Sequence, residues 1–162
     1  MRTSAQEASR VDPEDPQKEA LYAWEETWGP WNHNSLTIAE CRAWIDQSCA
    51  YYGVQPPRVR QHRTREFSWC HVNMGVISLQ GGKHRARGGR NVSQALHEVA
   101  HWIVFQDHGD KPQDHGPTFL GVYLWLLEAA QAAPRIALHA SARAHGLKWR
   151  SDMGPQRAET SQ

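Results

Sequence analysis

The pentapeptide His97-Glu98-Val99-Ala100-His101 combines residue types and a spacing that suit metal-dependent hydrolysis. Residues four apart on a helix share one face, so the two histidine side chains point the same way, one turn apart. Two imidazoles in this arrangement can bind one zinc ion, and Glu98 beside them can take a proton from a water on the metal. The motif therefore predicts a zinc hydrolase, and in particular a peptidase.

The segment around this motif predicts a buried helix over residues 94–106, with Asn91 or Ser93 as the N-cap. Apolar residues occupy much of its circumference: Leu96, Val99, Ala100, Ile103 and Val104. Histidine and glutamate side chains inside such a helix are costly to bury without partners. A bound metal ion would supply the missing partner.

A zinc hydrolase needs a third protein ligand, and the sequence offers three candidates. His108 lies near the metzincin position in HExxHxxGxxH, but Val104 and Asp107 stand where that motif needs glycine and histidine. Glu128, on the next predicted helix, and His115 are the other two candidates. The only later methionine, Met153, lies in a polar tail and is a poor candidate for a Met-turn.

We favour His115 because it directly precedes Gly116-Pro117, at the start of an apolar helix predicted over 117–133. Proline favours the first helical position, which makes Gly116 a plausible N-cap. A short polar connection links this helix to the one carrying the HExxH motif, so His115 can reach back to the metal. Glu128 stays open as the alternative third ligand.

A carboxylate is expected to orient one of the ligand histidines from outside the metal site. Asp107, Asp114 and Glu128 are the candidates, and nothing in the sequence chooses among them. Tyr123 could donate a hydrogen bond during the reaction, although a core role is the simpler interpretation.

The remaining pattern predicts an α+β fold, in which a small antiparallel sheet packs beside the HExxH helix and further core helices. Two or three strands are expected within 58–80, and the strand at 75–79 is a candidate edge for pairing with an extended peptide. The predicted helices, besides those at 94–106 and 117–133, cover residues 16–28, 37–52 (with a Thr37/Glu40 capping box) and 135–145.

Length and composition favour one domain, over residues 18–150, between a disordered tail at 1–17 and a flexible tail at 151–162. The cysteines form no CxxC pair, which argues against a zinc finger or a disulfide framework. The sequence has no apolar run long enough for a membrane span and no recognisable signal peptide, so we expect a cytoplasmic protein without a membrane partner.

Positive charge gathers in the segment 58–90, where Glu66 is the only acid. Its basic residues are Arg58, Arg60, Arg63, Arg65, Lys83, Arg85, Arg87 and Arg90. Such a segment can contact nucleic acid, and the alternative is a set of solvated strand and loop residues.

The two motifs together resemble the HExxH…HGPxF signature of SprT-like (Spartan-type) zinc metalloproteases, and of small bacterial and phage metallohydrolases with the same pattern. The resemblance covers about residues 35–131 and includes His115-Gly116-Pro117-Thr118-Phe119. It implies a minimal zincin-like fold, with His97, His101 and His115 as zinc ligands and Glu98 as the catalytic acid and base. SprT proteins often carry a C-terminal zinc ribbon, whereas this chain has no cysteine after Cys70.

The function predicted from these observations is a zinc-dependent peptidase that acts on a protein or peptide substrate. Two alternatives stay open. One is a regulatory peptidase of the ImmA/IrrE type, which cleaves a repressor. The other is a zinc-stabilised module that binds nucleic acid or protein without catalysis. A structural zinc site usually has four protein ligands and no open position, so a water molecule on the zinc would distinguish a peptidase from such a module.

Overall fold

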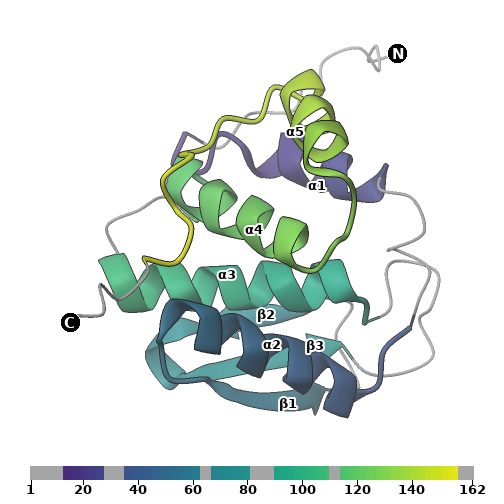
Figure 1. Cartoon of the computed structure of the whole chain (residues 1–162). Helices are drawn as coiled ribbons and strands as arrows, with labels where there is room; N and C mark the ends of the chain where they lie inside the picture. The colour runs from purple at the N-terminus through teal and green to yellow at the C-terminus, as the bar shows by residue number, and fades with distance from the viewer. Residues whose placement is uncertain (1–12, 28–34, 63–66, 81–89, 110–113, 157–162) are drawn as a thin grey trace, which may run out of the picture.

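The computed structural model describes residues 13–27, 35–62, 67–80, 90–109 and 114–156. These residues form an α+β fold of five helices and one small sheet (Figure 1). The helices are α1 (Lys18–Glu26), α2 (Ile38–Tyr52), α3 (Val92–His108), α4 (Pro117–Ala129) and α5 (Arg135–Ala144). The strands are β1 (Arg58–His62), β2 (Trp69–His71) and β3 (Val76–Gln80), with a short 3₁₀ turn, η2 (Val72–Met74), between β2 and β3.

The sheet is mixed, with strand order β1-β3-β2, so the prediction of an antiparallel sheet is wrong for one of its two pairings. β3 pairs antiparallel with β2 and parallel with β1. All five residues of β3 are buried, whereas β1 alternates arginine with Val59 and is largely exposed. The strand buried on both faces takes the centre of the sheet, where neighbours cover it. The segment 75–79 is therefore not an edge, and β2 forms the edge on that side.

The two most apolar helices, α3 and α4, pack against each other and form the centre of the core. α3 also contacts β2 and β3, while α2 packs on α3 and β1. Figure 1 shows α1, α4 and α5 on one side of α3, with α2 and the sheet on the other. The largest fully buried side chains include Trp24, Ile45, Ile77, Leu96, Ile103, Phe119, Leu120 and Tyr123. α3 thus runs through the middle of the molecule, as its apolar circumference predicts.

Local signals set the helix ends. The Thr37 hydroxyl accepts a hydrogen bond from the backbone N–H of Glu40, whose carboxylate accepts one from the Thr37 N–H, so the predicted capping box is confirmed. α2 ends at Gly53, which adopts a left-handed conformation with φ of 66°. The α4 helix ends four residues earlier than predicted, at Ala129, and the chain then turns through Gln131.

Both predicted tails include residues that pack on the domain. Asp15 is buried, and the Gln17 side chain donates hydrogen bonds to the carbonyl oxygens of His115 and Lys148. At the other end, Met153 is buried and its carbonyl oxygen accepts a hydrogen bond from the Tyr52 hydroxyl. Residues on both sides of the predicted limits of 18 and 150 therefore contribute to the packed structure.

Parts of several predictions lie outside the described residues: 1–12 and 157–162 of the tails, residue 28 of the first predicted helix, 63–66 of the predicted strand region, and 63–66 and 81–89 of the basic segment. Within the described part of that segment, Arg60 donates to the Ser78 hydroxyl and Arg90 to the carbonyl oxygen of Leu36. None of the helices in the described part of the chain has the length and apolar character needed to cross a membrane.

Candidate metal centre

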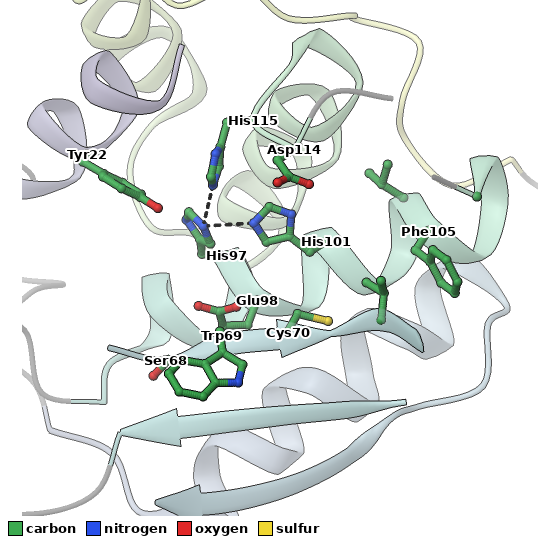
Figure 2. Close-up of a pocket in the computed structure, with 13 residues that line it drawn as sticks. Tyr22, Ser68, Trp69, Cys70, His97, Glu98, His101, Phe105, Asp114 and His115 are labelled. Carbon is green, nitrogen blue, oxygen red and sulfur yellow. Dashed lines mark hydrogen bonds between the residues drawn. The ribbon is translucent and has the colours of Figure 1, made fainter. Parts of the chain in front are cut away.

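The helix α3 places His97 and His101 one turn apart, with both side chains directed into the same cavity (Figure 2). Its start is fixed by Asn91, whose side-chain oxygen accepts a hydrogen bond of 2.8 Å from the backbone N–H of Gln94. The observed helix extends two residues beyond each end of the predicted range. Since both histidines lie well inside it, neither is affected by fraying at its ends.

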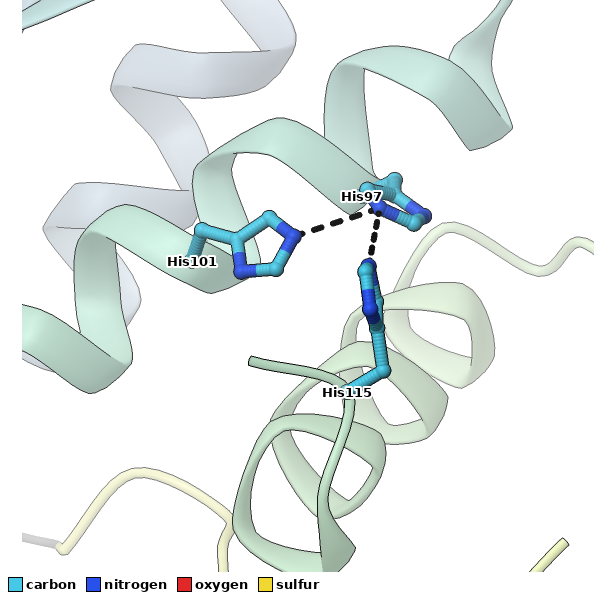
Figure 3. Close-up of side chains that lie close together, drawn as sticks. All are labelled: His97, His101 and His115. Atoms are coloured by element: carbon cyan, nitrogen blue, oxygen red, sulfur yellow. Dashed lines mark hydrogen bonds between the residues drawn. The ribbon is translucent and has the colours of Figure 1, made fainter. Parts of the chain in front are cut away.

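His115 joins these two side chains from the turn before α4. Gly116 is the N-cap of that helix and Pro117 its first residue, as predicted. The Nε2 atom of His97 lies 3.3 Å from Nε2 of His101 and 3.3 Å from Nε2 of His115 (Figure 3). One nitrogen from each of the three rings lies within 4.8 Å of the others, a separation that suits binding of a single metal ion.

Two carboxylates from the N-terminal segment hold the outer nitrogens of this cluster. Nδ1 of His97 donates to a Glu25 carboxylate oxygen at 2.8 Å, and Nδ1 of His115 donates to an Asp15 oxygen at 2.5 Å. Tyr123 donates a further hydrogen bond of 2.8 Å to the same Glu25 oxygen. A carboxylate can only accept, so the Nδ1 atom of each ring carries a proton and the Nε2 atom is left with its lone pair.

With these tautomers, the three histidines suit a metal ion better than they suit one another. In the neutral rings, the Nε2 lone pairs of His97 and His115 face each other at 3.3 Å with no proton between them. Such an arrangement is repulsive unless one ring is protonated or a cation lies between the nitrogens. Three neutral imidazoles, two of them oriented by carboxylates, match the donor set that zinc and similar divalent ions take in proteins.

The pKa values of the three rings differ because their neighbours differ. Burial lowers the pKa of His97, but the charge and hydrogen bond of Glu25 outweigh it and raise that pKa to about 8. Burial and the charge of His97 lower the pKa of His101 and that of His115, and Asp15 only partly opposes this for His115. In the metal-free protein, a proton on Nε2 of His97 therefore relieves the repulsion between its lone pair and those of the neighbouring rings.

Glu98 lies beside the cluster with its carboxyl group buried between α3 and β2. Its residue exposure is 5%, and burial raises its pKa to about 7 although the charge of His97 opposes the change. The backbone N–H of Cys70, in the edge strand β2, donates a hydrogen bond to it. Glu98 can thus bind or release a proton near neutral pH, as a general acid and base must.

An open cavity of about 360 Å³ borders the cluster. Its lining includes Tyr22 from α1, Asp114 and Phe105, besides residues 68–70 of the β2 region and the three histidines (Figure 2). Phe119 from α4 supports the cluster, because its ring stacks on that of His101 with 4.3 Å between the ring centroids. A ligand in this cavity would contact the Nε2 atoms and Glu98 together.

The three acids predicted to take part in the site, Glu128, Asp114 and Asp107, form no hydrogen bond with the cluster histidines among the described residues. Glu128 forms ion pairs with His139 and, at 3.5 Å, with Arg135, and it is not part of the histidine cluster. Asp114 lines the cavity but has no hydrogen bond to a cluster histidine among the described residues. Asp107 is exposed on the last turn of α3. Among the described residues, none of the three proposed carboxylates forms a hydrogen bond with His97, His101 or His115.

Sequence reasoning missed Glu25 and Asp15, the two carboxylates that orient His97 and His115. The helix predicted at 16–28 is rich in acids and aromatic residues, and that composition is the signal that could have identified them. In α1, Leu21 and Trp24 are buried against the domain, so Glu25, which follows Trp24, lies at the edge of the core. A search for acids beside buried aromatic residues would have added Glu25 to the candidates.

Comparisons with family models, with curated proteins and with solved structures give no match to this chain. The resemblance to SprT-like proteases therefore depends on the two motifs alone.

Proposed function

We propose that this chain is a zinc-dependent metallopeptidase with a minimal zincin-like fold, in which His97, His101 and His115 bind the metal. Glu98 is its general base and acid. The observation that carries the proposal is the convergence of three Nε2 atoms at an open cavity that also holds a buried carboxyl group. The resemblance to the SprT-like motif supports the same assignment. We expect the enzyme to act on a protein or peptide in the cytoplasm.

When bound, zinc supplies a Lewis acid that activates a water molecule and polarises a carbonyl group. Glu98 takes a proton from the attacking water as the water oxygen bonds to the carbonyl carbon and the carbonyl π electrons move to their oxygen. Glu98 then gives this proton to the amide nitrogen as the C–N bond breaks, which leaves an amine and a carboxylic acid. The Cys70 N–H keeps the Glu98 carboxyl in one position throughout.

The composition of the cluster favours a catalytic over a structural zinc site. Structural sites usually enclose the metal with four protein ligands. Among the described residues, the cluster holds three histidines, and no cysteine or acid lies close enough to be counted with them. The adjoining cavity leaves space for a substrate on the remaining side.

The proposal is tested with zinc-loaded wild type, Glu98→Gln and Glu26→Gln, using fluorescein-labelled casein as an unfolded substrate. Glu26 is an exposed acid on α1 and serves as the matched control. We expect wild type and Glu26→Gln to hydrolyse casein, to lose activity with a chelator and to regain it with zinc. Glu98→Gln should keep its zinc and lose roughly 10²-fold or more in rate. Equal rates for Glu98→Gln and wild type would refute the proposal.

A further inference from the structure

We propose that Tyr22 is a catalytic residue that donates a hydrogen bond to the carbonyl oxygen of the peptide bond being hydrolysed. This inference depends on the proposed peptidase function and adds a residue that neither motif contains. Tyr22 comes from α1, whereas Glu98 lies beside β2, so the two side chains border the histidine cluster from different elements. A substrate carbonyl at the cluster would therefore have a proton acceptor and a proton donor available from separate directions.

The position of the Tyr22 ring is set by contacts with two cluster histidines. Its centroid lies 5.5 Å from that of His115, in an edge-to-face arrangement with 72° between the planes, and 6.2 Å from that of His97. In Figure 2 its hydroxyl end is directed towards the cluster, and the residue lines the cavity. The ring contacts thus hold the phenol next to the place where a substrate would react.

The Tyr22 hydroxyl is available for a substrate. The residue is 39% exposed, and no hydrogen bond of its hydroxyl is found among the described residues. Tyr123, the tyrosine considered from the sequence, is 1% exposed and already bonds to Glu25 and to the carbonyl oxygen of Ser93. Tyr22 is therefore the tyrosine that can donate to a new ligand, and a phenol remains protonated at neutral pH.

The Tyr22 hydroxyl would contribute to catalysis because negative charge develops on the carbonyl oxygen to which it donates. When the water oxygen bonds to the carbonyl carbon, the carbonyl oxygen gains negative charge, and a hydrogen bond to it strengthens as the reaction proceeds. Donors of this kind change kcat by roughly 10²-fold or more when they are removed. Since the bond is weak in the ground state, KM should change little.

The test compares zinc-loaded Tyr22→Phe, Tyr51→Phe and wild type in casein hydrolysis, with zinc content measured for each. Tyr22→Phe keeps the ring and its histidine contacts, and Tyr51 is a similarly exposed tyrosine, at 45%, that does not line the cavity. We expect Tyr22→Phe to lose roughly 10²-fold in kcat with KM within about twofold and full zinc content. Inhibition by a phosphinic peptide, whose tetrahedral phosphorus resembles the substrate after attack, should weaken by a comparable factor.

Three results would overturn the inference, and they differ from one another. Equal kcat for Tyr22→Phe and Tyr51→Phe removes the role of Tyr22 and leaves the peptidase proposal intact. Loss of zinc from Tyr22→Phe means that the residue supports the metal site instead of the substrate. If the zinc-loaded wild type hydrolyses no casein and binds no phosphinic peptide, the proposed function and this inference fail together.

Discussion

A carboxylate oxygen of Glu25 lies 2.8 Å from Nδ1 of His97, a residue 72 positions further along the chain. Asp15 forms the equivalent bond with His115, 100 positions away. The N-terminal segment thus supplies both carboxylates that orient the cluster, although the histidines themselves come from α3 and from the start of α4. Docking of α1 on the core and metal binding at the cluster should be coupled, because each favours the same arrangement of rings.

The first prediction concerns this coupling. Glu25→Gln should weaken zinc binding by about 10- to 100-fold, because a neutral amide orients and polarises the His97 ring less well than a carboxylate. Asp15→Asn should have a similar effect through His115. Zinc affinity can be measured by competition with a chromophoric chelator. Glu26→Gln, one residue further along α1, is the control and should bind zinc as the wild type does. Unchanged affinity in Glu25→Gln would mean that the carboxylate does not support a ligand.

The second prediction is a pH dependence of zinc affinity. In the metal-free protein, burial and the charge of His97 lower the pKa values of His101 and His115, so both rings are neutral near pH 7. His97 has a pKa of about 8 and is protonated below that pH, so zinc must displace its proton. Affinity should rise about tenfold per pH unit from pH 6 and level off above about pH 8.

This titration is best measured in Glu98→Gln, because Glu98 also titrates near neutral pH. Adding Glu25→Gln should lower the pH at which zinc affinity levels off, since Glu25 is the main group that raises the pKa of His97. A plateau that already begins near pH 6.5 with Glu25 intact would show that His97 titrates like an ordinary histidine.

Much of the site could be predicted because its signals are local. The spacing of His97 and His101 fixes their common face on any helix, and Gly116-Pro117 marks a helix start wherever it is placed. These rules put His115 at the mouth of α4, and the structure brings it to the other two histidines. Periodicity, composition and helix-end signals likewise predicted the five helices of the described residues, each end to within four residues.

The features that the sequence did not reveal depend on tertiary packing. Nothing local to Asp15 or Glu25 says which histidine each will meet, since α1 must first dock on the core through Leu21 and Trp24. The order of the strands is a similar case. Consecutive strands usually lie side by side, but burial of β3 on both faces places it between β1 and β2.

The third prediction concerns thiol reactivity. Burial raises the pKa of Cys41 to about 11 and that of Cys49 to about 12, so both thiols stay protonated at pH 8. Iodoacetamide should leave both unmodified in the native protein and modify both in urea, as counted by mass spectrometry, with glutathione in the same mixture as the reactivity control. The raised pKa values disfavour the folded state once pH exceeds the ordinary thiol pKa, because the unfolded chain then releases protons that the folded chain keeps. Rapid native labelling of either residue would contradict this burial.

The fourth prediction tests the packing of the C-terminal segment on α4. A Cβ atom at Gly121 would lie 2.4 Å from the carbonyl oxygen of Arg150 and 2.6 Å from Cγ of Met153. Gly121→Ala should therefore lower the free energy of unfolding by about 1–3 kcal/mol, measured by urea denaturation. Ala129→Ser changes an exposed position of the same helix and should have little effect. If Gly121→Ala is as stable as the wild type, residues 150–153 do not lie against α4.

The central claim is that three imidazoles and no other side chain of this protein hold zinc. X-ray absorption spectroscopy of the zinc-loaded wild type, combined with metal analysis, tests it most directly. We predict one zinc per chain with three imidazole ligands and one oxygen that the protein does not supply. His115→Ala should lose an imidazole or the metal itself, while Glu128→Ala should match the wild type. Failure to take up zinc, a fourth protein ligand, or three imidazoles retained in His115→Ala would contradict the claim.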